Sequence, residues 1–246
     1  RATTICSGPG IGIQLTRGEH NDTAPCFRAD GALGFLSNRP PAAGKPDDEA
    51  KKRSQVWVLP AAGGEPYQVT DEPLGVDAFR FARDGDRLLC MAPVLPRQPH
   101  DKQREILDDR AKNGPSALRF TRQPVRHWDH WLPDGIATAV PHLIGYAQDG
   151  TGRRDLTPQA LREHLIEAEF AVSHDGRRAA ITSARVAQDR IDDVSLVLID
   201  LETGDARAVA AAPRTQFEHP CFSPDGARIA CLSTSRSVDR VGKPAL

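Results

Sequence analysis

A short pattern recurs four times along the chain and limits what the chain can fold into. Each copy has an aromatic or aliphatic residue, two spacer residues, Asp-Gly and then a run of alternating polarity. The copies begin at Phe27, Phe81, Val172 and Phe222. In such a segment Asp closes a turn through its own side chain, and Gly takes the positive φ that the turn needs. Because the run that follows alternates like a half-buried strand, each copy predicts a β-hairpin.

A second hairpin is predicted between the copies of the first. Residues 56–70, 142–157 and 194–210 each hold an apolar run, a Gly-containing turn and another apolar stretch. One unit of the repeat therefore holds four strands in two hairpins. A single such sheet cannot bury both of its faces, whereas sheets stacked around an axis can. The fold class we predict is all-β: a β-propeller with an incomplete set of four-stranded blades and a short helical insertion.

The spacing of the Asp-Gly turns gives the predicted blade boundaries. The spacing is about fifty residues twice and about ninety once, and about fifty is the length of a propeller blade. We expect blade-like units at 18–70, 71–157 and 158–210, a partial unit at 211–246, and an insertion at 95–133 within the second unit.

The whole chain, residues 1–246, is expected to be one propeller domain or a fragment of one. Three nearly complete blades with partial blades at both ends fall short of the four to eight that close a ring. Open edges would invite pairing with a missing segment, another chain or a swapped copy, and hence a homo-oligomer. Residues 101–112 are typical of a short polar helix that ends at Asn113-Gly114, and 157–168 holds a second helical pattern.

The charge balance excludes two classes of partner. Thirty-two Lys and Arg residues stand against 33 Asp and Glu residues, which gives a formal net charge of −1. A dedicated binder of nucleic acid or of an anionic membrane surface would show a basic excess. No apolar run approaches the ~18 residues that a spanning helix requires. We therefore expect no nucleic-acid partner and no membrane association.

The cysteines indicate the compartment. The five of them form neither a C-x-x-C pair nor a Cys/His cluster with zinc spacing. Cys90 and Cys231 lie in apolar runs, as small buried side chains do in a reducing compartment. The chain starts at Arg1 with no basic-then-apolar leader, so no signal peptide is expected. We predict a cytoplasmic protein that needs no cofactor and no metal.

Three stretches carry a resemblance to a known family: residues 15–22, 125–132 and 222–226. With them the chain resembles the amino-terminal propeller of the prolyl oligopeptidase family of serine peptidases, in the branch of acylaminoacyl and dipeptidyl peptidases. The resemblance implies an α/β-hydrolase domain of the same protein as partner, which carries a Ser-His-Asp triad. It also implies that the propeller restricts entry to the catalytic chamber, so that peptide substrates pass and large folded proteins do not.

This chain has no G-x-S-x-G nucleophile elbow, the strained turn that exposes the serine in such enzymes. We therefore expect the hydrolase domain to be absent from residues 1–246 and predict no catalytic residue. The Ser-Pro-Asp-Gly turn at 223–226 is shared by TolB-type propellers. An alternative function thus stays open, a stand-alone propeller that acts as a protein-binding scaffold without enzymatic activity.

The densest group of functional residue types is Arg-His-Trp-Asp-His-Trp at 126–131. Arg126, His127 and Trp128 are candidates for lining a substrate pocket, although packing of the tryptophan between strands or blades is the simpler interpretation. His127 and His130 would face opposite sides of a single strand, which argues against a shared metal ion.

Acidic residues of the predicted insertion helix are the second candidate site. Glu105, Asp108 and Asp109 share this helix, and Glu105 and Asp109 are four residues apart on one face. By the resemblance, propeller acids in the dipeptidyl-peptidase branch hold the free amino group of the substrate. The same helix also carries basic residues, Lys102 among them, and so fits a solvated, salt-bridged face equally well. The Asp-Gly aspartates lack closely spaced oxygen ligands and are interpreted as turn formers rather than calcium ligands.

Overall fold

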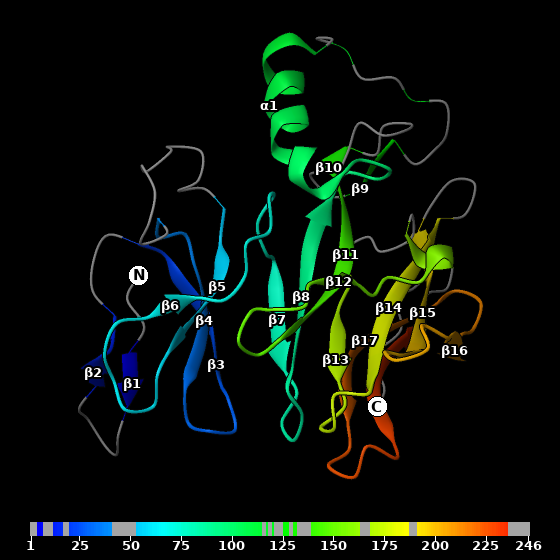
Figure 1. Cartoon of the computed structure of the whole chain (residues 1–246). Coiled ribbons are helices and arrows are strands. Elements are labelled where there is room, and N and C mark those ends of the chain that lie inside the picture. Colours follow the sequence, from blue (N-terminus) through cyan, green and yellow to red (C-terminus); the bar gives the residue numbers. More distant parts are fainter. Residues whose placement is uncertain are drawn as a thin grey trace.

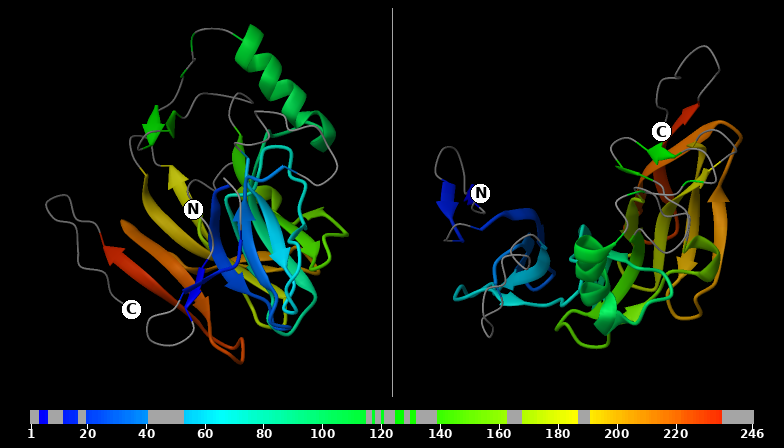
Figure 2. Two further views of the ribbon diagram at one scale, coloured as in Figure 1. Left: turned by 90° about the vertical axis from the view of Figure 1, so that its left-hand side faces the viewer. Right: turned by 90° about the horizontal axis from the view of Figure 1, so that it is seen from above.

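The computed structural model describes residues 4–6, 12–16, 20–40, 53–114, 117, 120, 125–127, 130–131, 139–162, 168–186 and 191–235. In this part of the chain, antiparallel sheets stand side by side, and one helix, α1 (Gln103–Asn113), stands off one end of them (Figures 1 and 2). The predicted fold class, an all-β propeller with a short helical insertion, is confirmed.

Three four-stranded blades follow one another along the chain. The first blade comprises β3 (Asp22–Phe27), β4 (Leu33–Ser37), β5 (Gln55–Leu59) and β6 (Tyr67–Gln68). The second blade comprises β7 (Ala78–Phe81), β8 (Arg87–Val94), β11 (Val140–Ala147) and β12 (Arg154–Asp155). The third blade comprises β13 (Phe170–Val172), β14 (Arg178–Val186), β15 (Ile191–Asp200) and β16 (Ala206–Ala210). In every blade the strands pair antiparallel in chain order.

Two hairpins flank the three blades. The short pair β1 (Thr4–Cys6) and β2 (Gly12–Gln14) precedes the first blade. The last hairpin, β17 (Thr215–Phe222) and β18 (Ile229–Ser235), follows the third blade and joins its sheet through parallel pairing of Val194 with Gln216. The repeat of strand, Asp-Gly turn and strand therefore continues beyond the third blade.

Apolar side chains fill the spaces between neighbouring blades. Val56 and Val58 of the first blade pack against Phe79, Phe81 and Ile144 of the second. A separate cluster of aliphatic and aromatic side chains, which includes Leu89, Leu143, Phe170, Ile181 and Ile199, joins the second blade to the third. Both faces of a blade are apolar. Each face is therefore buried only when a neighbouring blade packs against it.

The Asp-Gly turns form as predicted, with one exception in their backbone geometry. Gly31, Gly176 and Gly226 adopt φ values of 84°, 70° and 66°. Gly85 does not have a positive φ, so the prediction that every turn glycine needs one was wrong there. A Cβ at Gly85 would lie 2.8 Å from the carbonyl oxygen of Asp175 in the next blade, so close approach between turns explains this glycine.

The helical segments differ from their predicted bounds. A 3₁₀ helix, η2 (His100–Lys102), leads into α1, which ends at Gly114 as expected from the sequence. The second predicted helix, within 157–168, forms as a single 3₁₀ turn, η3 (Gln159–Leu161), and residues 163–167 lie outside the described part of the chain. Pro158 directly precedes η3, where a missing N–H is tolerated.

Candidate functional site

Helix α1 belongs to the connection between the second and third strands of the second blade, and it stands clear of the sheets (Figures 1 and 2). Gln103 is its only buried residue. The Gln103 side-chain oxygen accepts a hydrogen bond of 3.1 Å from the backbone N–H of Leu95, just beyond the end of β8. The base of the helix is thereby tied to the strand from which the insertion leaves.

Arg53, which lies just before β5, connects the helix to the first blade. Its Nη2 lies 3.4 Å from Oδ1 of Asp108, and its Nη1 donates to the carbonyl oxygen of Pro73 at 3.2 Å. Arg104 of the helix donates to the same carbonyl at 3.5 Å. Asp108, predicted to contact substrate, is therefore placed where it holds the helix against the segment between the first two blades.

The other two predicted acids also have partners on the helix itself. Lys102 donates to Glu105 at 3.0 Å, and Asn113 donates to Asp109 at 2.8 Å. All three acids nevertheless line one open groove of about 530 Å³. The groove is formed by Asp101, Arg104, Glu105, Asp108, Asp109 and Lys112. Acidic residues outnumber basic ones along it, a balance that favours a cation.

Residues 126–127 and 130–131 form two short strands rather than a single strand. The strands β9 (Arg126–His127) and β10 (His130–Trp131) pair antiparallel, with His127 opposite His130. The prediction that these two histidines lie on a single strand was therefore wrong, because β9 and β10 are separate strands that pair with each other. Trp128 lies outside the described residues. Among the residues that are described, no three His, Cys, Asp or Glu side chains are grouped as metal ligands.

A buried carboxylate that the sequence analysis missed lies in the same region. Glu72, in the segment between β6 and β7, is 1% exposed. Arg153 donates to both of its oxygens, at 2.8 Å from Nε and 3.0 Å from Nη2, and Tyr146 donates its hydroxyl to Oε1. His100, at the base of the insertion, places Nε2 at 3.5 Å from Oε2. Glu72 thus joins the interblade segment, the outer part of the second blade and the insertion.

The electrostatics of the cluster follow from burial. Burial raises the pKa of Tyr146 far above its ordinary value, and the hydrogen bond to Glu72 raises it further. Burial likewise raises the pKa of the Cys90 thiol, with a smaller contribution from the charge of Glu72. Both groups therefore stay protonated near neutral pH, and neither is a nucleophile or base there. The contacts of the cluster position the elements that it joins.

The backbone beside Glu72 is fixed by Gln55 and Thr70. Gln55 accepts from the Glu72 N–H at 3.0 Å and donates to the Glu72 carbonyl at 2.8 Å, while Thr70 donates to Gln55 at 2.9 Å. The Thr70 hydroxyl also accepts from the N–H of Val56, as Thr157 does from Leu143 in the second blade. The recurring apolar-Thr pairs at 69–70 and 156–157 are the sequence signal that could have pointed to this segment.

Comparisons with known proteins bear on the whole chain. No protein-family model matches it. It is 26% identical over 236 residues to the uncharacterized peptidase YuxL of Bacillus subtilis. This alignment covers 96% of the chain and 25% of that protein. It is also 26% identical over 236 residues to dipeptidyl-peptidase 5 of Porphyromonas gingivalis, covering 91% of the chain and 31% of that protein. The chain thus spans between a quarter and a third of these curated relatives.

Solved structures share the fold at low sequence identity. A prolyl endopeptidase superimposes with a TM-score of 0.52 and 11% identity, over 92% of this chain and 28% of that chain. The acylaminoacyl peptidase of Pyrococcus horikoshii superimposes with a TM-score of 0.52 and 12% identity, over 91% of this chain and 28% of that chain. TolB from Acinetobacter baumannii superimposes with a TM-score of 0.50 and 16% identity, over 95% of this chain and 42% of that chain. Identities this low show the fold alone.

No helix in the described ranges has the length and apolar character needed to cross a membrane. The relatives in sequence are peptidases, the fold is the propeller of solved peptidases, and the site has a docked insertion without a nucleophile elbow. In sequence, the chain is therefore similar to peptidases over more than nine-tenths of its length, and its fold resembles part of the solved prolyl endopeptidase and acylaminoacyl peptidase.

Proposed function

We propose that this chain is the non-catalytic propeller of a serine peptidase, which docks on an α/β-hydrolase domain of the same protein and gates the access of peptides. The observation that carries the proposal is similarity to peptidases along more than nine-tenths of the chain, although the chain spans at most 31% of them. Catalysis would then belong to the remainder of the protein, consistent with the lack of a G-x-S-x-G elbow.

The insertion is the element that we assign to gating. Helix α1 contacts the blades through few side chains, chiefly Gln103, Arg53 and Arg104. Weakly anchored elements of this kind open at low cost, whereas the blades beneath it are fixed by the buried Glu72 cluster. A mobile gate on a rigid base is the arrangement that size selection requires.

The acidic groove on α1 is the proposed contact for the peptide. Glu105, Asp108 and Asp109 offer carboxylates that can accept hydrogen bonds from a peptide ammonium group. Residues Arg126, His127 and Trp128 are retained as proposed pocket residues, because they belong to the same insertion in the sequence. A cytoplasmic location is also proposed, since Cys26, Cys90, Cys221 and Cys231 carry free thiols.

Substrate size discrimination by the native gene product tests the gating role. Arg53→Met removes the ion pair to Asp108, and Arg83→Met is the matched control, since it removes a positive charge from an exposed turn of the second blade. We expect Arg53→Met to raise kcat/KM for a long peptide relative to a blocked tripeptide by about threefold or more, because a loosened gate admits larger substrates. Arg83→Met should leave the ratio unchanged.

Equal changes for both substrates in Arg53→Met, or the same shift in Arg83→Met, would contradict gating by the insertion. The alternative, a stand-alone binding scaffold of the TolB type, is favoured by one observation, the coverage of 95% of this chain by the TolB fold. Its signature would be a native gene product with no peptidase activity that nevertheless binds protein partners.

A further inference from the structure

The insertion of the second blade leaves β8 through a tight turn. The backbone N–H of Gln98 donates to the carbonyl oxygen of Leu95 at 3.3 Å, with Pro96 and Arg97 between them. Arg97 has a φ of 61°, in the left-handed region that residues with a side chain rarely adopt. Leu95 itself is fully buried. The chain is therefore fixed at Leu95, and it changes direction within the next three residues.

The element that follows this turn, η2, places His100 beside the buried carboxylate of Glu72. Nε2 of His100 lies 3.5 Å from Oε2 of Glu72. This nitrogen is inaccessible to solvent and makes no hydrogen bond to any residue that the structure describes, although the His100 side chain is 39% exposed. The ring can therefore exchange a proton with water, while its Nε2 faces a carboxylate at slightly more than hydrogen-bond distance.

The Glu72 carboxylate is a fixed acceptor with room for one more donor. Arg153 and Tyr146 both donate to Oε1, whereas Oε2 accepts from Arg153 alone within the described part of the chain. A group that only accepts hydrogen bonds has the pattern of an ionised carboxylate. Gln55 holds the Glu72 backbone at both its N–H and its carbonyl. Separation of His100 from Glu72 would therefore move the insertion and leave the carboxylate in place.

Two titratable neighbours of Glu72 stay uncharged in the neutral range. Burial raises the pKa of the Cys90 thiol well above its ordinary value, and the charge of Glu72 raises it further. Burial and the hydrogen bond to Glu72 likewise raise the pKa of Tyr146. Histidine is the side chain whose charge changes between about pH 5 and 8. His100 is the histidine that contacts this cluster.

The other charged groups around the contact have partners of their own. They are Arg153 on the second blade, Arg53 before β5, and Asp101, Lys102, Arg104, Glu105 and Asp108 on η2 and α1. Arg53 and Arg104 donate to the carbonyl of Pro73, and Arg53 also pairs with Asp108. Lys102 donates to Glu105. Arg153 opposes a positive charge on His100, and the adjoining Oε2 of Glu72 favours one.

A proton on His100 would complete the contact with Glu72. A neutral imidazole carries a proton on one of its nitrogens, whereas an imidazolium carries a proton on both. Nε2 of the charged ring is therefore always a donor toward Oε2, and a charged donor forms a shorter and stronger bond to a carboxylate than a neutral one. A neutral ring with its proton on Nδ1 would instead direct a lone pair at the carboxylate. The docked position of the insertion thus favours the protonated ring.

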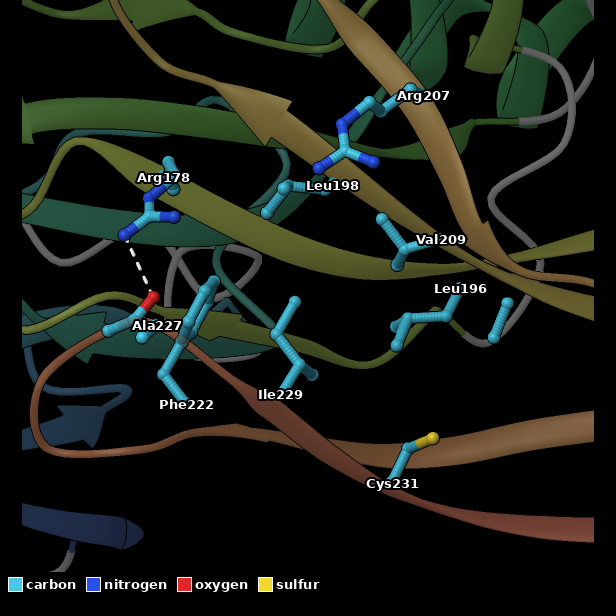
Figure 3. A pocket seen from close by; sticks show the side chains of 11 residues that line it. Arg178, Leu196, Leu198, Arg207, Val209, Phe222, Ala227, Ile229 and Cys231 are labelled. Atoms are coloured by element: carbon cyan, nitrogen blue, oxygen red, sulfur yellow. Dashed lines mark hydrogen bonds between the residues drawn. The ribbon is translucent and has the colours of Figure 1, made fainter.

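Two junctions between neighbouring units are joined by arginine. Arg87 of the second blade donates to the carbonyl of Leu201 and to the carboxylate of Glu202 in the third. Arg178 of the third blade donates to the carbonyl of Gly226 in the last hairpin at 2.8 Å (Figure 3). Arginine keeps its charge throughout the pH range in which proteins are folded. These two junctions should therefore persist at a pH at which the His100 contact changes.

We propose that the contact of His100 with Glu72 is a pH-sensitive switch, which holds α1 on the blades when His100 is protonated and releases it when His100 is neutral. Docking strengthens as the pH falls through the range in which histidines gain a proton, and it weakens as the pH rises. The turn at 95–98 is the pivot. The consequence for peptides rests on the proposed function: size selection would be strict in mild acid and relaxed in mild base.

Hydrogen exchange of the α1 amides in the native gene product tests the switch. Exchange is measured by mass spectrometry at about pH 5.5 and about pH 8 for the wild type and for His100→Gln. The ratio of the two rates at each pH cancels the intrinsic pH dependence of amide exchange. At the lower pH we expect α1 to exchange about fivefold faster in His100→Gln than in the wild type, because the variant lacks the ion pair. At the higher pH the two proteins should exchange alike.

Two further variants separate charge from packing. His100→Lys keeps a positive charge at both pH values, and it should protect α1 at the higher pH as the wild type does at the lower one. His219→Gln is the matched control. It removes a histidine whose Nδ1 lies 3.0 Å from Oε1 of Glu169, at the junction of the third blade with the last hairpin. Exchange of α1 in this control should match the wild type at both pH values.

An effect of His100→Gln that is equal at both pH values would overturn the proposal, because His100 would then act by packing alone. No effect at the lower pH, or no protection by His100→Lys at the higher pH, would overturn it too. The ratio of kcat/KM for a long peptide to that for a blocked tripeptide reports separately on gating, and it should rise with pH in the wild type. A switch in α1 exchange without any change in this ratio would uphold the inference and contradict the gating role.

Discussion

Arg153 and Glu72 form a two-pronged ion pair between the second blade and the segment that leads into it. Nε of Arg153 lies 2.8 Å from Oε1 of Glu72, and Nη2 lies 3.0 Å from Oε2. The Glu72 side chain is 1% exposed, and the Arg153 side chain is 27% exposed. This pair holds together the base on which the insertion stands.

Loss of the Glu72 carboxylate should destabilise the whole protein. Glu72→Ala leaves the guanidinium of Arg153 and the hydroxyl of Tyr146 without their acceptor in a buried site. We expect the free energy of unfolding to fall by about 3 kcal/mol, which is the usual cost of removing one partner of a buried ion pair. Urea denaturation of the 246-residue chain measures it, with Glu65→Ala as the exposed control. A loss equal to that of the control would show that Glu72 contributes little.

The close contact of Gly34 with Phe81 predicts a compensating pair of substitutions. Gly34→Ala places a methyl group 2.4 Å from the Phe81 ring and should destabilise the fold by about 1–3 kcal/mol through overpacking. Phe81→Leu should itself be destabilising, yet it should recover part of the stability of Gly34→Ala. A double-mutant cycle in urea measures the coupling between them. Additive effects would contradict a close contact between Gly34 and Phe81 across the two blades.

Weakening the contact between α1 and the first blade should affect the helix locally and leave the global stability unchanged. Asp108→Asn weakens the pair with Arg53, which is partly exposed and contributes less than about 1 kcal/mol to global stability. We expect hydrogen exchange of the α1 amides to accelerate while the global unfolding midpoint stays within error. Glu105→Gln, which weakens only the exposed pair with Lys102, is the control. Unchanged exchange in Asp108→Asn would show that other contacts dock the helix.

The first Asp-Gly turn should have an acid-shifted carboxyl group. The side chain of Arg28 donates to Asp30, and this bond, with the N–H of Ala32, lowers the pKa of Asp30 from 3.8 to about 2. Because the folded-state value lies below the unfolded one, the stabilisation is present above pH 3.8 and is lost as the pH falls toward 2. Titration of the Asp30 carboxyl by NMR checks the value. Arg28→Met should return it toward 3.8, and an unperturbed pKa in the wild-type protein would refute the turn's hydrogen bonding.

The parts of the fold that could be predicted from the sequence are those that local chemistry determines. An Asp-Gly turn forms through bonds between residues two apart, such as Ala32 with Asp30, and strand alternation extends over a few residues. The helix of the insertion likewise depends on its own residues and on the Gly114 that ends it. These features recur along the chain, and repetition is visible without any knowledge of the fold.

The Glu72 cluster could not be predicted, because its members are distant in sequence. Tyr146 and Arg153 lie 74 and 81 residues from Glu72, and only the stacking of blades brings them together. The same holds for His142, an apparently isolated histidine whose Nδ1 lies 2.8 Å from Oδ2 of Asp155 on the neighbouring strand. Single sequences show periodicity along one strand but give no information on which strands become neighbours.

The hairpin at 126–131 shows a different cause of error. The run of aromatic and charged residues predicts one strand, whereas the structure has two antiparallel strands in which His127 pairs with His130. The sequence between these two strands holds no Gly, Pro or Asn, the residue types that most often indicate a turn. Turn signals were therefore sufficient at the Asp-Gly positions and insufficient here.

The central claim, that this chain is the propeller of a serine peptidase, is tested most directly by labelling the native gene product with a fluorophosphonate and measuring its intact mass. The 246-residue chain is treated in parallel. We expect one labelled species, larger than this chain, with a single added phosphonyl group on a serine outside residues 1–246, and no label on the chain itself. A native product of the mass of this chain that takes no label would contradict the account and leave the binding scaffold in its place.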